Sequence, residues 1–278
     1  VCSSDLVRPG SAPNNKERRP IPMNISQVYA VYFSATGNTR KVTTTLANAL
    51  AVSFDVPLEV RDFTLPAARE EAYEFAAGDL VVFGMPTYAG KLPNKLLDFV
   101  KSGFHGNGAL AVPVVTFGNR SFDNSLAELC ACLEGDGFHT IGAGAFACRH
   151  AFTDALANGR PDSDDMAELA KLGSAVVGRI VRMTEYPAPV MVDGDADAPY
   201  YRPLGLDGEP KVFLKAKPKT DLDKCIHCGV CASLCPMGSI NPDDVTEVVG
   251  VCIKCHSCVR NCPMGAKYFD DPDRKSVV

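Results

Sequence analysis

Eight cysteines of this chain fall into two runs with the same spacing. The first is Cys225-x2-Cys228-x2-Cys231-x3-Cys235-Pro236, and it recurs as Cys252-x2-Cys255-x2-Cys258-x3-Cys262-Pro263. This spacing is typical of paired [4Fe–4S] clusters, because three thiolates of one loop reach one cluster while the cysteine before proline reaches the other. We expect one cluster on Cys225, Cys228, Cys231 and Cys262, and a second on Cys252, Cys255, Cys258 and Cys235.

The surroundings of these cysteines leave some alternatives open. Zinc sites share the Cys-x2-Cys pair, but eight cysteines in two matched runs disfavour zinc. His227 and His256 lie between the expected ligands, and we interpret both as exposed loop residues. The alternative is that their protonation tunes the cluster potential.

A second motif, Ser34-Ala35-Thr36-Gly37-Asn38-Thr39, lies between a short apolar run and a helical pattern. We call residues 34–39 the phosphate loop. Its hydroxyls and backbone N–H groups, with a helix N-terminus behind them, can bind a dianionic phosphate without a lysine. It has neither the lysine of a Walker loop nor the spacing of a dinucleotide fingerprint. An ordinary capped helix start is the alternative.

Two more loops follow predicted strands, where doubly wound sheets bind ligands. In the Tyr88 loop, residues 84–93, we expect Tyr88 to stack on a flavin and Gly90 to let the backbone approach the ring. In the Arg120 loop, residues 118–122, amides would meet the pyrimidine edge and Phe122 would add cover. The expected flavin-binding residues are Ser34, Thr36, Gly37, Asn38, Thr39, Pro86, Thr87, Tyr88, Gly90, Gly118, Asn119 and Arg120.

The segment that carries these three loops alternates between strand and helix patterns. The strands are expected at residues 28–33, 58–62, 80–84, 109–117 and 140–147, and the helices at 39–52, 93–100, 121–134 and 162–183. Nearly continuous apolar runs are typical of parallel strands covered on both faces. The pattern predicts an α/β domain with a doubly wound, five-stranded parallel sheet.

Composition suggests five segments along the chain. The Pro/Gly-rich residues 185–220 predict a connector between a sheet domain at 23–184 and a small α+β domain at 221–272. Residues 1–22 read as a disordered or foreign flank, because the chain starts at Val1 and Met23 precedes the first strand. Residues 273–278 form a tail.

Bulk properties exclude several classes. A net charge of -5 argues against a nucleic-acid surface. The apolar runs fall short of the roughly 20 residues of a membrane span, and the N-terminal residues lack a secretory apolar core. We therefore expect a cytoplasmic protein in which the cysteines serve metal chemistry rather than disulfides.

Residues 27–184 resemble a flavodoxin, and residues 221–272 resemble a two-cluster bacterial ferredoxin. Together they resemble the flavodoxin–ferredoxin fusion proteins of anaerobic bacteria, which implies FMN, two [4Fe–4S] clusters and redox partner proteins. The chain departs from flavodoxins by having Arg120 in its third loop and no tryptophan. If Arg120 lies near the flavin, its charge would stabilise the anionic hydroquinone and so raise the reduction potential of the flavin. The alternative is that Arg120 is a surface residue with no such effect.

We expect electron transfer between low-potential one-electron carriers and FMN through the two clusters. One alternative is a ferredoxin-dependent flavin reductase acting on a quinone, a disulfide or another small oxidised substrate, with residues 148–161 as a lid. A redox sensor is a second alternative. The sequence identifies no catalytic residue, and a homodimer that completes the electron path stays open.

Overall fold

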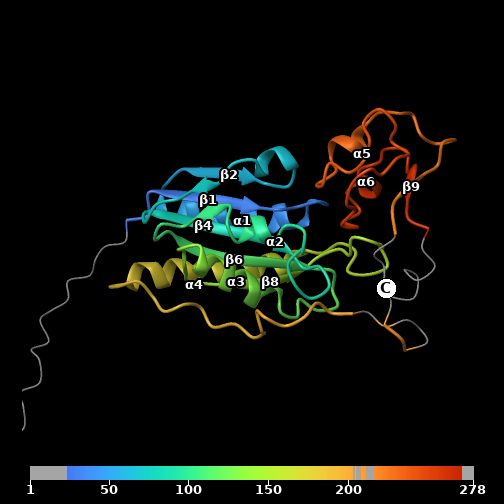
Figure 1. Ribbon diagram of the computed structural model, residues 1–278. Coiled ribbons are helices and arrows are strands. Elements are labelled where there is room, and N and C mark those ends of the chain that lie inside the picture. The colour runs from blue at the N-terminus through green and yellow to red at the C-terminus, as the bar shows by residue number, and fades with distance from the viewer. Residues whose placement is uncertain (1–23, 203, 205–207, 211–215, 271–278) are drawn as a thin grey trace, which may run out of the picture.

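The computed structural model describes residues 24–202, 204, 208–210 and 216–270 (Figure 1). The expected flank at 1–22 and tail at 273–278 lie outside the described residues. The remaining domain boundaries stay predictions.

The larger part of the chain is built on one parallel sheet with the order β2-β1-β4-β6-β7, and β8 also pairs with β6. Its strands are β1 (Gln27–Tyr32), β2 (Leu58–Asp62), β4 (Asp79–Pro86), β6 (Leu110–Phe117), β7 (His139–Thr140) and β8 (Gly144–Ala147). Every pairing in this sheet is parallel. The predicted doubly wound α/β fold is confirmed, since the chain moves to one edge and then crosses back to the other.

The fifth strand was expected as one element over residues 140–147, and this is wrong. It consists of β7 and β8, which pair with opposite ends of β6. Between them the carbonyl of Ile141 accepts a hydrogen bond from Nη1 of Arg179 at 3.0 Å. The N–H of Ile141 still donates to the carbonyl of Ala111 at 2.9 Å, and regular pairing with β6 resumes at Gly144.

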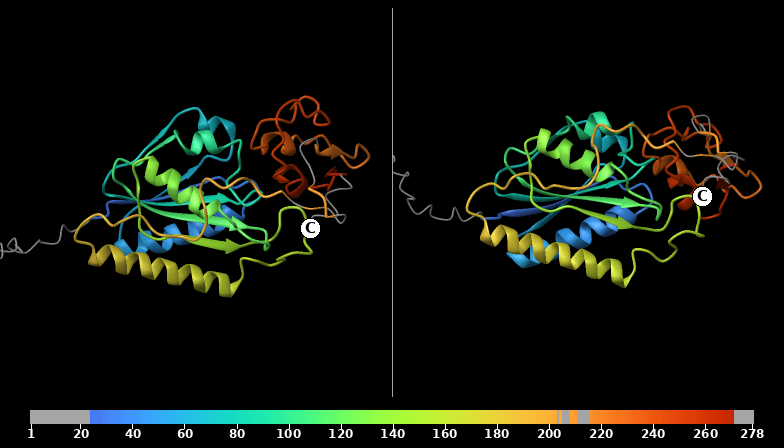
Figure 2. Two further views of the ribbon diagram at one scale, coloured as in Figure 1. Left: turned by 60° about the horizontal axis from the view of Figure 1, so that its bottom comes forward. Right: turned by 90° about the horizontal axis from the view of Figure 1, so that it is seen from below.

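Helices cover both faces of the sheet (Figure 2). On one face, α1 (Asn38–Phe54) and α4 (Ser163–Arg182) pack Leu46 and Val176 against Val28 and Leu80. The other face carries η1 (Pro66–Arg69), α2 (Leu97–Val100), α3 (Ser125–Gly135) and a small parallel pair, β3 (Tyr73–Glu74) with β5 (Phe104–His105). The prediction missed this pair and expected a longer α2.

The C-terminal part is a small α+β unit, as predicted. It comprises β9 (Lys219–Thr220), α5 (Val230–Ser233), α6 (Ser257–Arg260) and β10 (Lys267–Tyr268), and β9 pairs antiparallel with β10. Cys231, Cys258, Ile240 and Val245 form its small core. In Figures 1 and 2 this unit, drawn in orange and red, lies beyond one end of the parallel sheet.

The connector contains no helix within its described residues and lies against the sheet domain as it returns towards the Tyr88 loop. Lys91 anchors it, because its ammonium donates to the carbonyls of Ala196 and Ala198 at 2.7 and 2.8 Å. The backbone N–H of Tyr201 then donates to the carbonyl of Ala89 at 2.8 Å. In the described part of the chain we find no helix with the length and hydropathy of a membrane span.

Replacing Gly84 with alanine tests the close approach of α1 to β4. A Cβ at Gly84 would lie 1.9 Å from Oγ1 of the buried Thr43, so we expect Gly84→Ala to lower the free energy of unfolding by about 1–3 kcal/mol. Gly135→Ala is the matched control, because nothing lies within 4 Å of its added Cβ. Urea unfolding followed by circular dichroism measures both, and equal stability of the two variants would contradict this packing.

Candidate functional site

The eight spaced cysteines line two separate cavities. One, with about 340 Å³ of empty space open to solvent, is lined by Cys225, Cys228, Cys231 and Cys262 among other residues. The second, with about 360 Å³, is lined by Cys235, Cys252, Cys255 and Cys258 among others. Each cavity thus combines three cysteines of one run with the last cysteine of the other run. These are the two groupings that the spacing predicts.

The backbone around the two cavities repeats the same unusual conformations. His227 and Gly229 have φ angles of 52° and 72°, and the corresponding Lys254 and His256 have 58° and 62°. Positive φ costs energy in non-glycine residues and persists where the surrounding structure demands it. Both cysteine loops, at 225–231 and 252–258, therefore fold alike, as expected for a duplicated binding unit.

Backbone N–H groups support thiolates at the last cysteine of each run. The amide of Ser239 donates to Sγ of Cys235 at 3.3 Å, and the amide of Ala266 donates to Sγ of Cys262 at 3.2 Å. Burial opposes ionisation of Cys262, but backbone hydrogen bonds from residues 264–267 together leave its pKa below the ordinary value. By contrast, burial raises the pKa of Cys255 and Cys258 to about 12. Thiols of this kind become thiolates on binding a metal, so the donor set fits iron–sulfur clusters.

The two cysteine loops differ in what surrounds them. Cys228 and His227 of the first loop are exposed, and Ile226 keeps 60% of its surface accessible. In the second loop, Ile253 packs against the core of the sheet domain. The expectation that His256 is exposed is wrong: it is 2% exposed, and its ring stacks between Phe152 and Phe269 at 4.3 and 4.4 Å.

The phosphate loop ends at the N-terminus of α1, where Gly37 adopts a φ of 92°. Within the described residues, the backbone N–H groups of residues 35–39 have no hydrogen-bond acceptor. The Ser34 hydroxyl accepts from the amide of Arg40 at 3.0 Å, and buried Thr39 is bonded to Thr116 at 2.8 Å. Five free donors at a 17-residue helix start fit the phosphate of FMN.

The Tyr88 loop is held rigidly. The Tyr88 N–H donates to the Lys91 carbonyl at 2.8 Å, and Thr87 Oγ1 bonds to Ser125 Oγ at 2.6 Å. Lys91, 6% exposed, forms an ion pair with Glu128 at 3.0 Å. Gly90 has a φ of 79°, and a Cβ there would lie 2.5 Å from Oδ2 of Asp123, so the loop needs glycine. Pro86 ends β4 directly before it.

The Arg120 loop differs from the expectation for a free cation. Arg120 forms an ion pair with Asp123, and its guanidinium lies 4.0 Å from the ring centroid of Tyr201 in the connector. The carboxylate offsets part of its charge, which weakens any effect on a flavin potential. Phe122 packs against Phe117 with ring centroids 5.6 Å apart, while Gly118 and Asn119 lie at the end of β6.

The second cavity is close to the sheet domain. Burial holds the pKa of Tyr88 well above its ordinary value, and thiolates at Cys255 and Cys252 would raise this pKa further. Met237 and Ile253, which line the second cavity, pack against the core of the sheet domain. The second cavity therefore lies against the domain that carries the candidate flavin loops.

The sequence contained no indication of several partners of the expected site residues. Thr64 accepts a hydrogen bond from the amide of Ser34 at 2.8 Å, and the carbonyl of Arg149 accepts one from the side chain of Asn38 at 3.0 Å. Tyr201 enters from the connector. The remaining described cysteines, Cys130, Cys132 and Cys148, are buried and have pKa values raised to about 12 by burial, as expected for packing residues.

Comparison with known families agrees with this arrangement. A family model of the flavodoxin domain matches residues 29–116, and a model of the 4Fe-4S dicluster domain matches residues 217–263. The chain is a flavodoxin domain fused to a 4Fe–4S dicluster domain. The expected FMN and [4Fe–4S] cofactors are confirmed by these domains, and the chain is an electron-transfer flavo-iron-sulfur protein.

Solved flavodoxins are similar to the first domain. A flavodoxin of Streptococcus pneumonia TIGR4 is 16% identical and covers 55% of this chain and 99% of its own, with a TM-score of 0.40. A flavodoxin from the domain Archaea is 17% identical over 55% of this chain and 98% of its own, with a TM-score of 0.37. Flavodoxin 2 from Bacillus cereus is 14% identical and covers 55% of this chain and 98% of its own, with a TM-score of 0.40. A search of the curated proteins found no match.

Single substitutions test the exchange of cysteines between the two runs. We expect Cys262→Ala to damage the cluster of the first cavity and Cys235→Ala that of the second, because each thiol lines the cavity of the other run. Iron analysis and EPR of the reduced protein would show two different residual cluster signals. Cys132→Ala is the control and should keep all the iron. Loss of the same signal in both variants would refute the exchange.

A charge in the phosphate loop tests its ligand. We expect Thr36→Asp to weaken FMN binding at least about tenfold, because a carboxylate would repel the phosphate, and to leave riboflavin binding nearly unchanged. Thr45→Asp on the exposed side of α1 is the control. Flavin fluorescence titration gives both dissociation constants. Equal weakening of FMN and riboflavin would argue against phosphate binding here.

Proposed function

We propose that this protein transfers electrons between low-potential one-electron carrier proteins and FMN, with two [4Fe–4S] clusters between them. Such clusters exchange one electron at a time and FMN accepts one or two, so the chain can connect one-electron and two-electron chemistry. The proposal rests above all on the packing of the second cysteine loop against the flavodoxin domain, where Ile253 meets its core and His256 stacks on Phe152. A cluster held there would lie against the domain that carries the candidate flavin loops.

The proposed ligands follow the two cavities. Cys225, Cys228, Cys231 and Cys262 would hold the outer cluster, and Cys235, Cys252, Cys255 and Cys258 the inner one. FMN would be held by the phosphate loop, by Pro86, Thr87, Tyr88 and Gly90, and by Gly118, Asn119 and Arg120. The Tyr88 loop suits this role because its hydrogen bonds and the Lys91–Glu128 pair fix its conformation before any ligand binds.

The exposed first cysteine loop suits contact with a redox partner. Leu222 and Ile226 are each 60% exposed, and Met264 beside the same cavity is 47% exposed. Exposed apolar side chains around a redox centre favour brief protein contacts. The second loop, by contrast, is covered by the flavodoxin domain through Ile253 and His256. A partner would therefore meet the outer cluster first.

Anaerobic reductive titration after cluster reconstitution tests this proposal. We expect about eight irons and one FMN per chain, with cluster and flavin absorbance changing together as dithionite is added and electrons redistribute. Absorbance and EPR follow the two kinds of centre. Clusters without bound flavin, or a flavin that stays oxidised beside reduced clusters, would count against the proposal. Faster turnover with a quinone or disulfide than with a carrier protein would favour the reductase alternative.

A further inference from the structure

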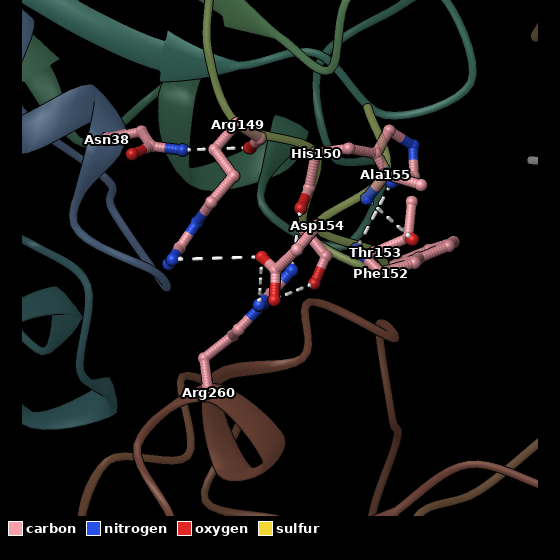
Figure 3. A network of polar contacts seen from close by, with 9 residues as sticks. Asn38, Arg149, His150, Phe152, Thr153, Asp154, Ala155 and Arg260 are labelled. Atoms are coloured by element: carbon pink, nitrogen blue, oxygen red, sulfur yellow. Dashed lines mark hydrogen bonds and ion pairs between the residues drawn. The ribbon is translucent and has the colours of Figure 1, made fainter. Parts of the chain in front are cut away.

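Arg260 makes three hydrogen bonds from the dicluster domain to the flavodoxin domain (Figure 3). Its Nε donates to the carbonyl of Ala151 at 2.9 Å and its Nη2 to the carbonyl of His150 at 2.9 Å. Its Nη1 donates to Oδ1 of Asp154 at 2.7 Å. All three acceptors lie in residues 149–154, which follow β8 and which we call the docking loop.

The chemistry of this contact favours arginine. The Arg260 side chain is 16% exposed, so its charge has lost most of its water and depends on these acceptors. A guanidinium can serve two carbonyls and a carboxylate at once through its planar fork, which a lysine ammonium cannot do in the same geometry. Asp154 is 59% exposed, so the two carbonyl bonds contribute more than the ion pair.

The docking loop is bonded to the phosphate loop on its other side. The Asn38 side chain donates to the Arg149 carbonyl at 3.0 Å, and the Arg149 guanidinium lies 3.8 Å from the carboxylate of Asp154 (Figure 3). One short segment therefore contacts both the start of α1 and the end of α6. Arg260 itself lies between the candidate ligands Cys258 and Cys262 in the sequence.

Other contacts between the domains gather around the inner cavity. Phe152 of the docking loop stacks on His256 with ring centroids 4.3 Å apart. From the flavodoxin side, Arg69 donates to the carbonyl of Pro236, which follows Cys235, at 2.5 Å. Met237 and Ile253 pack against the flavodoxin core. These contacts surround the second cysteine loop, and Arg260 makes the most hydrogen bonds among them in the described residues.

We propose that Arg260 is a positioning residue for electron transfer, which holds the second cysteine loop against the flavodoxin domain by docking on residues 149–154, themselves bonded to the phosphate loop. Its effect on electron transfer rests on the proposed function, whereas its effect on domain docking does not. Without Arg260 the carbonyls of His150 and Ala151 lose their charged donor and the dicluster domain leaves the docked position more often. Cofactor binding itself does not depend on it.

The test uses the full-length protein loaded with clusters and FMN, in the variants Arg260→Ala and Arg260→Lys. After rapid photoreduction of the clusters, we expect the rate of electron arrival at the flavin to fall at least about tenfold in Arg260→Ala, and less in Arg260→Lys, which keeps the charge. Lys219→Ala removes an exposed cation that pairs with Asp270 inside the dicluster domain, and should react like the wild type. Iron content, FMN content and midpoint potentials should be unchanged in all three.

Hydrogen–deuterium exchange supplies a second readout that needs no electron transfer. Amides of residues 149–154 should exchange faster in Arg260→Ala than in the wild type and in Lys219→Ala. If Arg260→Ala changed neither the amide exchange of residues 149–154 nor the rate of electron arrival at the flavin, the proposal would be overturned. Loss of iron from Arg260→Ala would also overturn it, because Arg260 would then be needed for the structure of the cluster site. Asp154→Ala is a variant distant from the cysteines, and we expect it to slow electron arrival at the flavin less than Arg260→Ala does. Wild-type rates in both Asp154→Ala and Arg260→Lys would also count against the proposal. If the wild type passes no electrons to flavin, the proposed function fails while the exchange data still test the docking.

Discussion

The packing of the second cysteine loop against the end of the parallel sheet determines what this molecule can do. Electron tunnelling weakens steeply with distance, so two redox centres in one chain cooperate only when the fold holds them close. Here Ile253 packs on the flavodoxin core, His256 stacks on Phe152, and Arg69 donates a hydrogen bond to the carbonyl of Pro236. These contacts join two domains that each have their own core.

A duplicated unit carries two roles because its copies have different neighbours. The backbone of the two cysteine loops repeats down to the positive φ angles of corresponding residues. Among the described residues, the flavodoxin domain covers the second copy through Ile253, whereas the corresponding Ile226 of the first copy faces solvent. Burial and exposure, rather than ligand type, thus distinguish an inner from an outer centre.

Local patterns in the sequence predicted most of this structure. The spacing of the cysteines is a local feature of the sequence, and it predicts which thiols line each cavity. Apolar runs likewise predict buried parallel strands. Two of the failures involve contacts between residues distant in sequence. Arg179 of α4 bonds to the carbonyl of Ile141 at the break in the fifth strand, and His256 is covered by Phe152 of the other domain as well as by Phe269 of its own. Arg260 occupies a non-ligand position of the second cysteine run and Tyr201 lies in the connector, so only the docked arrangement shows their contacts.

The central claim is that electrons pass between the clusters and the flavin within one chain. The most direct measurement is the rate of flavin reduction after rapid photoreduction of the clusters, repeated over a wide range of protein concentrations. The docking of the second cysteine loop on the flavodoxin domain of the same chain predicts a first-order rate that does not change with concentration. A rate that rises in proportion to protein concentration would show that electrons pass between molecules, and would contradict the account.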